Sequence, residues 1–278
     1  MEQFTTVEGL RTRLAALRGT SIGFVPTMGA LHEGHVSLVR KARSENDTVV
    51  VSVFVNPTQF NDKNDLRNYP RTPEADIEVL RKAGADLVFM PTVEEIYPEP
   101  DTRVFDFGTI DKVMEGATRP GHFNGVAQVV SRLFSIVEPQ RAYFGEKDFQ
   151  QIAVIREMLR QLALDIEISP CPIVREEDGL ALSSRNRLLS AELRKAAPGI
   201  YRALKDAADK AGQTGIAETE AAVIRHIESD PLLKVIYFKL VDEETLADVS
   251  DWNTGKHIRG CVAVQAGDIR LIDNIRFV

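Results

Sequence analysis

The stretch TVVVSVFV at residues 48–55 constrains the fold more than any other part of the chain. Almost all of its side chains are apolar, and most of them are β-branched. It lacks the alternation of polar and apolar residues that marks a strand with one exposed face. A strand of this kind is covered on both faces, as the central strands of a parallel sheet are. The sequence therefore predicts an α/β protein.

The pattern around this stretch extends the prediction over residues 1–175. Further strands are expected at 21–25, ending at Pro26, and at 86–90, 142–144 and 166–168. Helices are expected at 34–45, 121–137 and 149–162, and a fourth from the capping pair Thr72-Pro73 to residue 82. Strands that alternate with helices at this spacing favour a Rossmann-like, doubly wound parallel sheet.

The pattern changes after about residue 190. Two alanine-rich helical stretches, 190–211 and 217–228, precede short strands at 235–240, 260–265 and 269–275. The pair Gly267-Asp268 between the last two strands is typical of a hairpin turn. We therefore expect a Rossmann-like domain at residues 1–175, followed by a smaller α+β C-terminal domain at residues 176–278. A chain of 278 residues agrees with two domains.

Composition excludes several classes of function. The formal net charge is −7, and neither side of a division at residue 175 is basic, so no nucleic-acid partner is expected. No apolar run approaches the length of about 20 residues that a membrane span needs, and the N-terminal residues show no signal-peptide pattern. Cys171 and Cys261 form neither a metal-binding pair nor a disulfide framework. We expect a cytoplasmic protein without a membrane partner.

The segment PTMGALHEGHVSLV at residues 26–39 carries the clearest chemical signal. Ligands of such folds bind beyond the carboxyl ends of the strands, where the next helix begins. His32 and His35 are three residues apart and would share one helix face, and Gly34 lets a ligand approach the backbone. This indicates a cradle for phosphate groups. Two alternatives stay open here: a pair of surface histidines that cap a helix, and a zinc site, although HEGH is not the H-E-x-x-H pattern.

Four further segments follow predicted strands or precede predicted helices. Asn56 and Gln59 come after the strand at 48–55, and their amides suit a small polar substrate, although this segment taken alone is better explained as a plain turn with an exposed glutamine. FGEKDFQQ at 144–151 offers Lys147 to a phosphate, but charged residues at a helix start are common on surfaces. The stretch at 180–190 is either a polar linker or a clamp of phosphate donors, and TRPGHFNGV at 118–126 offers either ligands or surface residues.

Taken together and in order, these segments resemble a known family. PTMGALHEGH, VFVNPTQF, TRPGHFNGV, FGEKDFQQ and SSRNRLLS are similar to the signatures of the pantoate–β-alanine ligases, also called pantothenate synthetases. The similarity extends from about residue 20 to the C-terminus. H-x-G-H alone is less specific, because nucleotidylyltransferases and class I aminoacyl-tRNA synthetases share it.

The resemblance implies an AMP-forming ligase that works in two steps. Pantoate and ATP would give pantoyl adenylate and pyrophosphate, and β-alanine would then displace AMP to give pantothenate. ATP would be a substrate, with Mg²⁺ carried on its phosphates and no metal site built from protein side chains. The family also implies a homodimer with a Rossmann-like first domain and a smaller second domain.

The resemblance further assigns roles to individual residues. Catalytic roles fall to His35, as proton donor, and to His32, Lys147, Ser183, Ser184 and Arg185. The ATP site comprises Met28, Gly29, Ala30, Leu31, His32, Glu33, Gly34, His35, Gly145, Glu146, Lys147, Asp148, Val174, Leu182, Ser183, Ser184 and Arg185. Gln59 and Gln151 would hold pantoate, with Asn56, Arg119 and His122 as further candidates for contacts to pantoate or β-alanine.

Two positions depart from the family pattern. Leu182 stands where methionine is common, and Phe149 stands where tyrosine is frequent, so a side-chain hydrogen bond at residue 149 is in doubt. Three other functions compete with a ligase: a nucleotidylyltransferase, a fragment of an aminoacyl-tRNA synthetase and a nucleotide-binding module. The acidic second half disfavours tRNA binding. The segments at 54–60 and 145–151 favour a site that holds a second substrate.

Overall fold

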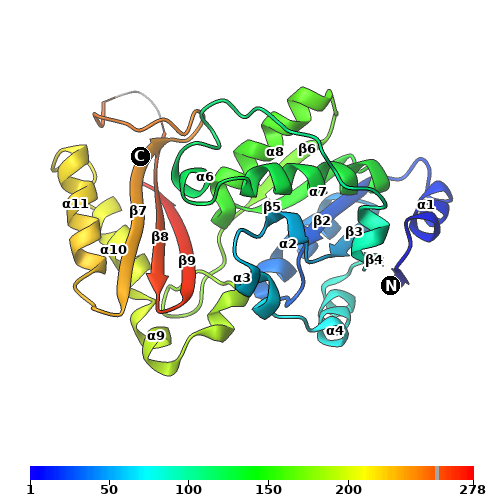
Figure 1. The fold of residues 1–278 in the computed structure, drawn as a ribbon, viewed down its shortest axis with the longest axis horizontal. Coiled ribbons are helices and arrows are strands. Elements are labelled where there is room, and N and C mark those ends of the chain that lie inside the picture. Colours follow the sequence, from blue (N-terminus) through cyan, green and yellow to red (C-terminus); the bar gives the residue numbers. More distant parts are fainter. Residues whose placement is uncertain (254–256) are drawn as a thin grey trace. The chain divides into compact units, whose positions relative to one another are not determined.

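The computed structural model describes residues 1–253 and 257–278, and these form two compact units (Figure 1). The N-terminal unit comprises Met1–Gly108, Arg119–Glu146 and Gln151–Pro172. The C-terminal unit comprises Thr109–Thr118, Lys147–Gln150 and Ile173–Val278. Two short segments therefore belong to the C-terminal unit although they lie inside the sequence of the first.

The N-terminal unit is built on a six-stranded sheet in which every pair of neighbours is parallel. The order across the sheet is β1 (Glu2–Phe4), β4 (Leu87–Phe89), β3 (Thr48–Val53), β2 (Ile22–Thr27), β5 (Arg141–Gly145) and β6 (Glu167–Cys171). Its helices are α1 (Val7–Ala15), α2 (Glu33–Glu45), α3 (Lys63–Asn68), α4 (Pro73–Ala83), α5 (Val93–Ile96), α7 (His122–Val137), most of α8 (Phe149–Leu162) and the 3-10 turn η1 (Pro57–Gln59). This confirms the predicted Rossmann-like parallel sheet.

Helices cover both faces of the sheet, which is why its central strands β2, β3 and β4 are largely apolar. On one face Val25, Val49 and Val88 pack against apolar side chains of α2 and α4. On the other face Phe24 meets Phe134 of α7 edge to face, with ring centroids 6.2 Å apart. The burial of side chains on both faces is the physical basis of the continuous apolar pattern at residues 48–55.

The structure corrects the expected end of β2, because the strand continues through Pro26 to Thr27. The carbonyl of Thr27 accepts a hydrogen bond from Phe54 N on the β3 side. The backbone N–H and C=O groups of successive strand residues point alternately to the two neighbouring strands. Those of Thr27 point toward β3, so the backbone of Pro26 is directed toward β5. The β2–β5 register ends at the pair Phe24 and Ala142, before it reaches Pro26. The missing N–H of proline therefore costs no hydrogen bond of the sheet.

The C-terminal unit combines an antiparallel sheet with helices and confirms the predicted α+β character. Its strands are β7 (Leu233–Asp242), β8 (Ile258–Ala266) and β9 (Ile269–Arg276), and its other elements are α6 (Met114–Thr118), η2 (Glu146–Asp148, from Lys147 on), η3 (Ser184–Leu188), α9 (Ala191–Ala196), α10 (Gly199–Ala208) and α11 (Ile216–Ile227). The predicted hairpin turn at Gly267-Asp268 is confirmed, because Ala266 pairs with Ile269. The helical stretch expected at 190–211 is instead two helices that are interrupted at Pro198, which lacks the N–H that a continuous helix needs.

Within the described residues, no helix combines the length and the apolar character needed to cross a lipid bilayer.

Candidate active site

The turn that follows β2 has an unusual backbone that a buried carboxylate holds in place. Gly29 and Ala30 both have positive φ angles, 82° and 49°. Asp76 of α4 is only 2% exposed; its Oδ2 accepts a hydrogen bond from Ala30 N (2.9 Å) and its Oδ1 accepts one from Leu31 N (2.8 Å). A Cβ atom on Gly29 would lie 3.0 Å from Asp76 Oδ2, so a side chain there would crowd the carboxylate. These contacts fix the path of the chain into α2.

His32 and His35 together form the cap of α2. Nδ1 of His32 accepts a hydrogen bond from Gly34 N (3.2 Å), and Nδ1 of His35 accepts one from His32 N (3.3 Å). The two rings lie side by side, with centroids 4.1 Å apart, as the spacing of three residues predicts. A ring nitrogen that accepts carries no proton, so this network assigns each neutral ring its proton on Nε2. Each ring therefore presents an Nε2–H donor.

A network of amides follows the end of β3. Nε2 of Gln59 lies 3.1 Å from Met28 Sδ, and Nδ2 of Asn56 donates to Gln59 Oε1 (3.2 Å) and to Gly125 O (3.2 Å). Asn56 is 1% exposed, and its Oδ1 also accepts a hydrogen bond from Tyr97 Oη (3.0 Å). The buried Asn56 thus orients the half-buried Gln59 beside Met28.

His122, in the first turn of α7, holds the main chain of the same segment. Its Nδ1 lies 2.8 Å from Gln59 O, and its Nε2 lies 3.2 Å from Arg119 Nη1. These partners determine which ring nitrogen of His122 donates and which accepts, because the Gln59 carbonyl can only accept a hydrogen bond and the Arg119 guanidinium can only donate one. His122 is therefore protonated on Nδ1 and accepts from Arg119 on Nε2. The structure thus brings Met28, Asn56, Gln59, Arg119 and His122 into one connected cluster.

The remaining predicted residues of the N-terminal unit are Gly145, Glu146 and Gln151, which lie at or just after the carboxyl end of β5, with Gln151 at the start of α8. Gly145 closes β5, and a Cβ built on it would meet no heavy atom within 4 Å. Open space therefore adjoins the backbone at Gly145, as the approach of a ligand would require.

The other predicted residues lie in the C-terminal unit. Lys147 and Asp148 are neighbours in η2, with Nζ and Oδ1 3.4 Å apart. Val174 and Leu182 face each other across a hairpin, in which Leu182 N donates to Val174 O (3.0 Å). The next segment contains Ser183, Ser184 and Arg185, and the hydroxyl of Ser183 accepts a hydrogen bond from Arg185 N to start η3. The hairpin thus determines where the serine-arginine segment begins.

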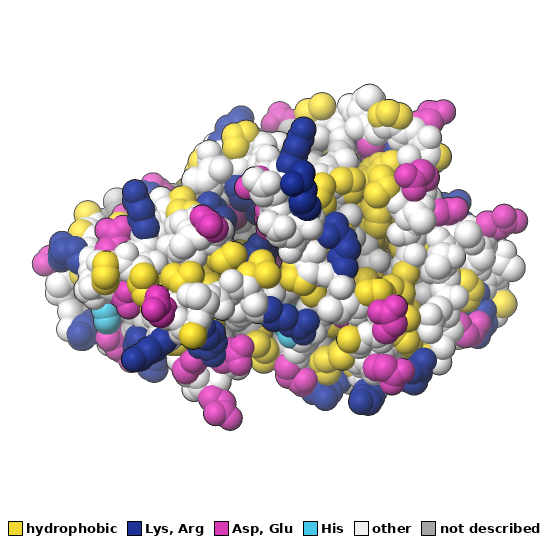
Figure 2. Space-filling view, turned by 60° about the horizontal axis from the view of Figure 1, so that its bottom comes forward, with side chains coloured by type: hydrophobic (Ala, Val, Ile, Leu, Met, Phe, Trp, Pro, Cys, Tyr) yellow, Lys and Arg dark blue, Asp and Glu magenta, His cyan; other side chains and the backbone are white. Residues whose placement is uncertain are grey.

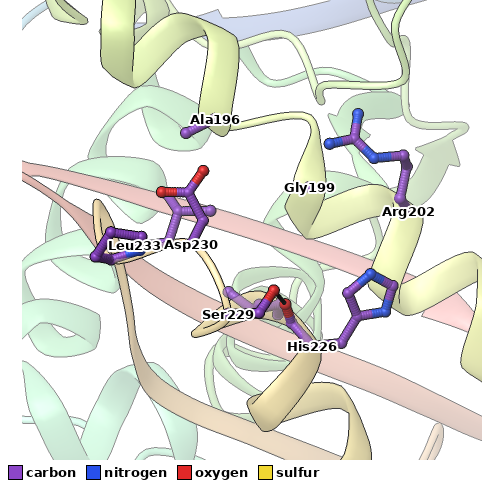
Figure 3. Close-up of a pocket in the computed structure, with 9 residues that line it drawn as sticks. Ala196, Gly199, Arg202, His226, Ser229, Asp230 and Leu233 are labelled. Carbon is purple, nitrogen blue, oxygen red and sulfur yellow. Dashed lines mark hydrogen bonds between the residues drawn. The ribbon is translucent and has the colours of Figure 1, made fainter.

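A surface hollow of about 350 Å³ lies elsewhere in the C-terminal unit (Figure 3). Its lining includes Gly199, Arg202, His226, Ser229 and Asp230, and it includes none of the predicted site residues.

Figure 2 shows basic and acidic side chains interspersed over one face of the molecule.

The structure also describes the thiols and the groups that could bind a metal ion. Cys171 and Cys261 are buried free thiols, and burial raises the pKa of Cys171 to about 11 and that of Cys261 to about 12. Both thiols therefore stay protonated at neutral pH. Within residues 1–253 and 257–278, no group of three or more His, Cys, Asp or Glu side chains is arranged to hold a metal ion.

Comparison with known proteins places the chain in a family. The family model described as pantoate-beta-alanine ligase matches residues 2–276. The pantothenate synthetase of Bacteroides thetaiotaomicron is 55% identical over 279 residues, which covers 100% of this chain and 99% of the relative. That of Phocaeicola vulgatus is 57% identical over 280 residues, with the same coverage. The chain belongs to the pantoate–β-alanine ligase family.

Solved structures agree with this assignment. The pantothenate synthetase of Thermus thermophilus superposes with a TM-score of 0.93 at 51% identity, covering 100% of this chain and 99% of that one. A pantoate-β-alanine ligase from Francisella tularensis, solved in complex with β-γ ATP and β-alanine, gives a TM-score of 0.85 at 35% identity, with coverage of 100% and 98%. As a member of the pantoate–β-alanine ligase family, the chain is an enzyme of the ligase class.

Two residues that support the candidate site escape the sequence patterns. Asp76 occupies the first turn of a helix, where acidic residues are common whatever their role, so its position gives no signal. Tyr97 lies outside every quoted motif, although its hydroxyl completes the bonding of Asn56. Only the folded chain shows that both support the segments after β2 and β3.

We expect the substitution Asp76→Asn to lower the free energy of unfolding by about 1.5–3 kcal/mol, the range for hydrogen bonds to a charged group. Asparagine can accept from one of the two main-chain N–H groups but turns its own NH₂ toward the other. Urea unfolding followed by circular dichroism measures the difference. Thr72→Val is the matched control, because it removes only the hydroxyl that donates to Asp76 at 3.1 Å. Equal stability of Asp76→Asn and the wild type would contradict the prediction.

Proposed function

We propose that the chain condenses pantoate with β-alanine at the expense of ATP, by way of an enzyme-bound pantoyl adenylate. In the first step an oxygen of the pantoate carboxylate bonds to the α-phosphorus of ATP, and the bond to the leaving pyrophosphate breaks. In the second step the β-alanine amine bonds to the acyl carbon, and AMP leaves. The amine gives up its proton, and the product is pantothenate.

The observation that carries this proposal is the pairing of His32 and His35 at the start of α2. Both Nδ1 atoms accept main-chain hydrogen bonds, so the orientation of both rings is fixed and each neutral ring carries its proton on Nε2. Donors fixed in advance stabilise the negative charge that develops on pyrophosphate, because they need no reorganisation during the reaction. We assign proton donation to His35, and we assign charge stabilisation to His32, Lys147, Ser183, Ser184 and Arg185.

The amide cluster supports a second substrate beside the histidines. Gln59 is held at its side chain by Asn56 and at its main chain by His122. A neutral amide in a fixed position can bind the hydroxyl and carboxylate groups of pantoate without adding charge. We assign pantoate binding to Gln59 and Gln151, with further contacts from Arg119, His122 and Asn56.

ATP binding completes the proposal. We assign it to residues 28–35 and 145–148, and to Val174, Leu182, Ser183, Ser184 and Arg185. Mg²⁺ would be carried on the ATP phosphates and, when bound, would neutralise part of their charge. Residues 1–175 would bind ATP and pantoate, and residues 176–278 would form a lid domain. A homodimer in the cytoplasm is part of the same proposal, and the two free thiols suit a reducing compartment.

Product analysis tests this function directly. Purified protein is incubated with ATP, Mg²⁺ and pantoate, with and without β-alanine, and the released pyrophosphate and AMP are quantified separately. We expect pyrophosphate up to the enzyme concentration without β-alanine, and sustained release of both products with it. ATP binding without pyrophosphate formation would refute the ligase assignment.

We expect His35→Ala to lower the rate of pyrophosphate formation by a factor of about 10²–10³, the loss that removal of one donor to a developing oxyanion causes. The fold should remain, because the cap of α2 loses only one acceptor. Single-turnover kinetics measure the rate, and His226→Ala, on the surface of the C-terminal unit, is the matched control. Adenylation at the wild-type rate in His35→Ala would remove His35 from the mechanism.

We expect Gln59→Ala to raise the KM for pantoate about tenfold to a hundredfold, since one hydrogen bond to a charged group contributes about 1.5–3 kcal/mol. The Kd for ATP should change less than about twofold by the same reasoning, because Gln59 is assigned to pantoate alone. Steady-state kinetics and calorimetric titration separate the two effects. Equal losses for pantoate and ATP would indicate damage to the fold instead.

A further inference from the structure

Two adjacent residues of β9, Asp273 and Asn274, are buried polar groups that no assigned function uses. Asn274 is 2% exposed, and its Nδ2 donates to the carbonyl of Lys147 (3.1 Å). Its Oδ1 accepts a hydrogen bond from Arg259 Nη1 (2.7 Å). A buried amide costs free energy unless both of its ends are bonded, so Asn274 is committed to this geometry. The main chain at Lys147 is therefore held by the C-terminal sheet.

Asp273 is 5% exposed and holds a different segment. Its carboxylate accepts a bidentate pair of hydrogen bonds from Arg175, at 2.6 and 2.9 Å. The same guanidinium donates to Gly179 O (3.1 Å) and lies 3.8 Å from the centre of the Tyr201 ring. Arg175 thereby fixes the tip of the hairpin between residues 174 and 182. Ser183, Ser184 and Arg185 follow directly on this hairpin.

A main-chain hydrogen bond joins the two residues to each other. Asp273 Oδ1, which accepts from Arg175 Nη2, also accepts from Asn274 N (2.8 Å). A shift of Arg175 therefore disturbs the same oxygen that orients Asn274. Charge-assisted bonds of this kind are shorter and stronger than neutral ones, so the pair can transmit position between its two sides.

The segment around Lys147 is anchored at two more points in the C-terminal unit. The Arg259 guanidinium lies 4.4 Å from the centre of the Phe149 ring. The buried Gln150 donates from Nε2 to Ile110 O (2.6 Å) and to Val113 O (2.8 Å). Residues 147–150 therefore have a defined place within the C-terminal unit, although in sequence they follow closely on β5.

We propose that Asp273 and Asn274 are positioning residues that hold Lys147 and the Ser183–Arg185 segment as one body. Both segments are assigned above to the phosphates of ATP, so this inference rests on the proposed function and deepens it. A displacement of about 1 Å at a catalytic group can cost about a hundredfold in rate, which gives a distant pair of this kind a large effect. Neither residue touches substrate in this scheme.

The first test is independent of activity and uses hydrogen exchange measured by mass spectrometry on the full chain without substrates. Asn274→Asp keeps the acceptor for Arg259 but loses the donor to Lys147 O. Asp273→Asn loses one side of the bidentate pair. We expect each variant to raise exchange about fivefold or more in peptides covering both 144–151 and 174–186, since a net hydrogen bond contributes about 1 kcal/mol or more.

Asp242→Asn is the matched control for exchange. Asp242 is a buried carboxylate of the same sheet, but it accepts from Thr245 N (2.8 Å) and Thr245 Oγ1 (2.6 Å) in a turn far along the chain from both segments. Arg175→Lys is a third variant, which weakens the bidentate contact to Asp273 from the hairpin side and should raise exchange in the same two segments. Changed exchange in one segment only, or equal changes in Asp242→Asn, would overturn the coupling of the two segments.

The second test is a double-mutant cycle on pyrophosphate formation. We expect Asn274→Asp to lower the turnover number about tenfold to a hundredfold, with the KM for pantoate within about twofold. In a Lys147→Ala background, the same substitution should have a clearly smaller effect, because the part of its action that passes through Lys147 is already lost. Full effects in both backgrounds would show a general structural role and overturn the proposal. Wild-type protein that forms no pyrophosphate would instead refute the proposed function, and the exchange data would still decide the coupling.

Discussion

The parallel pairing of β2 with β3 is the interaction on which the N-terminal site depends. The register sets Thr27 opposite Val53, and Phe54 N donates to Thr27 O at 3.0 Å, so both strands end at the same edge of the sheet. The chain that leaves β2 therefore begins its turn beside the chain that leaves β3. Met28 and Gln59 come into contact although 31 residues separate them. A shift of the register by one residue would turn the side chains of one strand to the other face of the sheet and displace the loop that follows that strand.

This constraint explains why much of the fold and part of the site could be predicted from sequence. The apolar stretch at 48–55 identifies a strand that is covered on both faces, and a parallel sheet requires that its functional loops share one edge. The spacing of His32 and His35 is a local property of a helix start, and the structure confirms that their rings lie together. Pattern and spacing are sufficient where the determining contacts lie within a few residues of each other.

Other features depend on contacts that no local pattern records. Asp76 meets Ala30 from 46 residues away, and Asn274 meets Lys147 from 127 residues away. In the sequence each is an ordinary polar residue of a helix or a strand. The sequence predicts a strand end at Pro26 for a similar reason, because it does not show toward which neighbouring strand the backbone N–H of a strand residue points. Long-range partners decide these cases, and they become visible only when the chain is folded.

The two departures from the family pattern are compatible with the same site for physical reasons that the structure supplies. Phe149 contacts Arg259 through the face of its ring, at 4.4 Å, and this attraction arises from the ring quadrupole and needs no hydroxyl. Leu182 is fixed through its main chain, since its N–H donates to Val174 O. Leucine and methionine have similar volumes, so the exchange leaves the hairpin and its apolar surface in place. In both cases the contact that positions the segment does not depend on the atoms by which the residue departs from the family pattern.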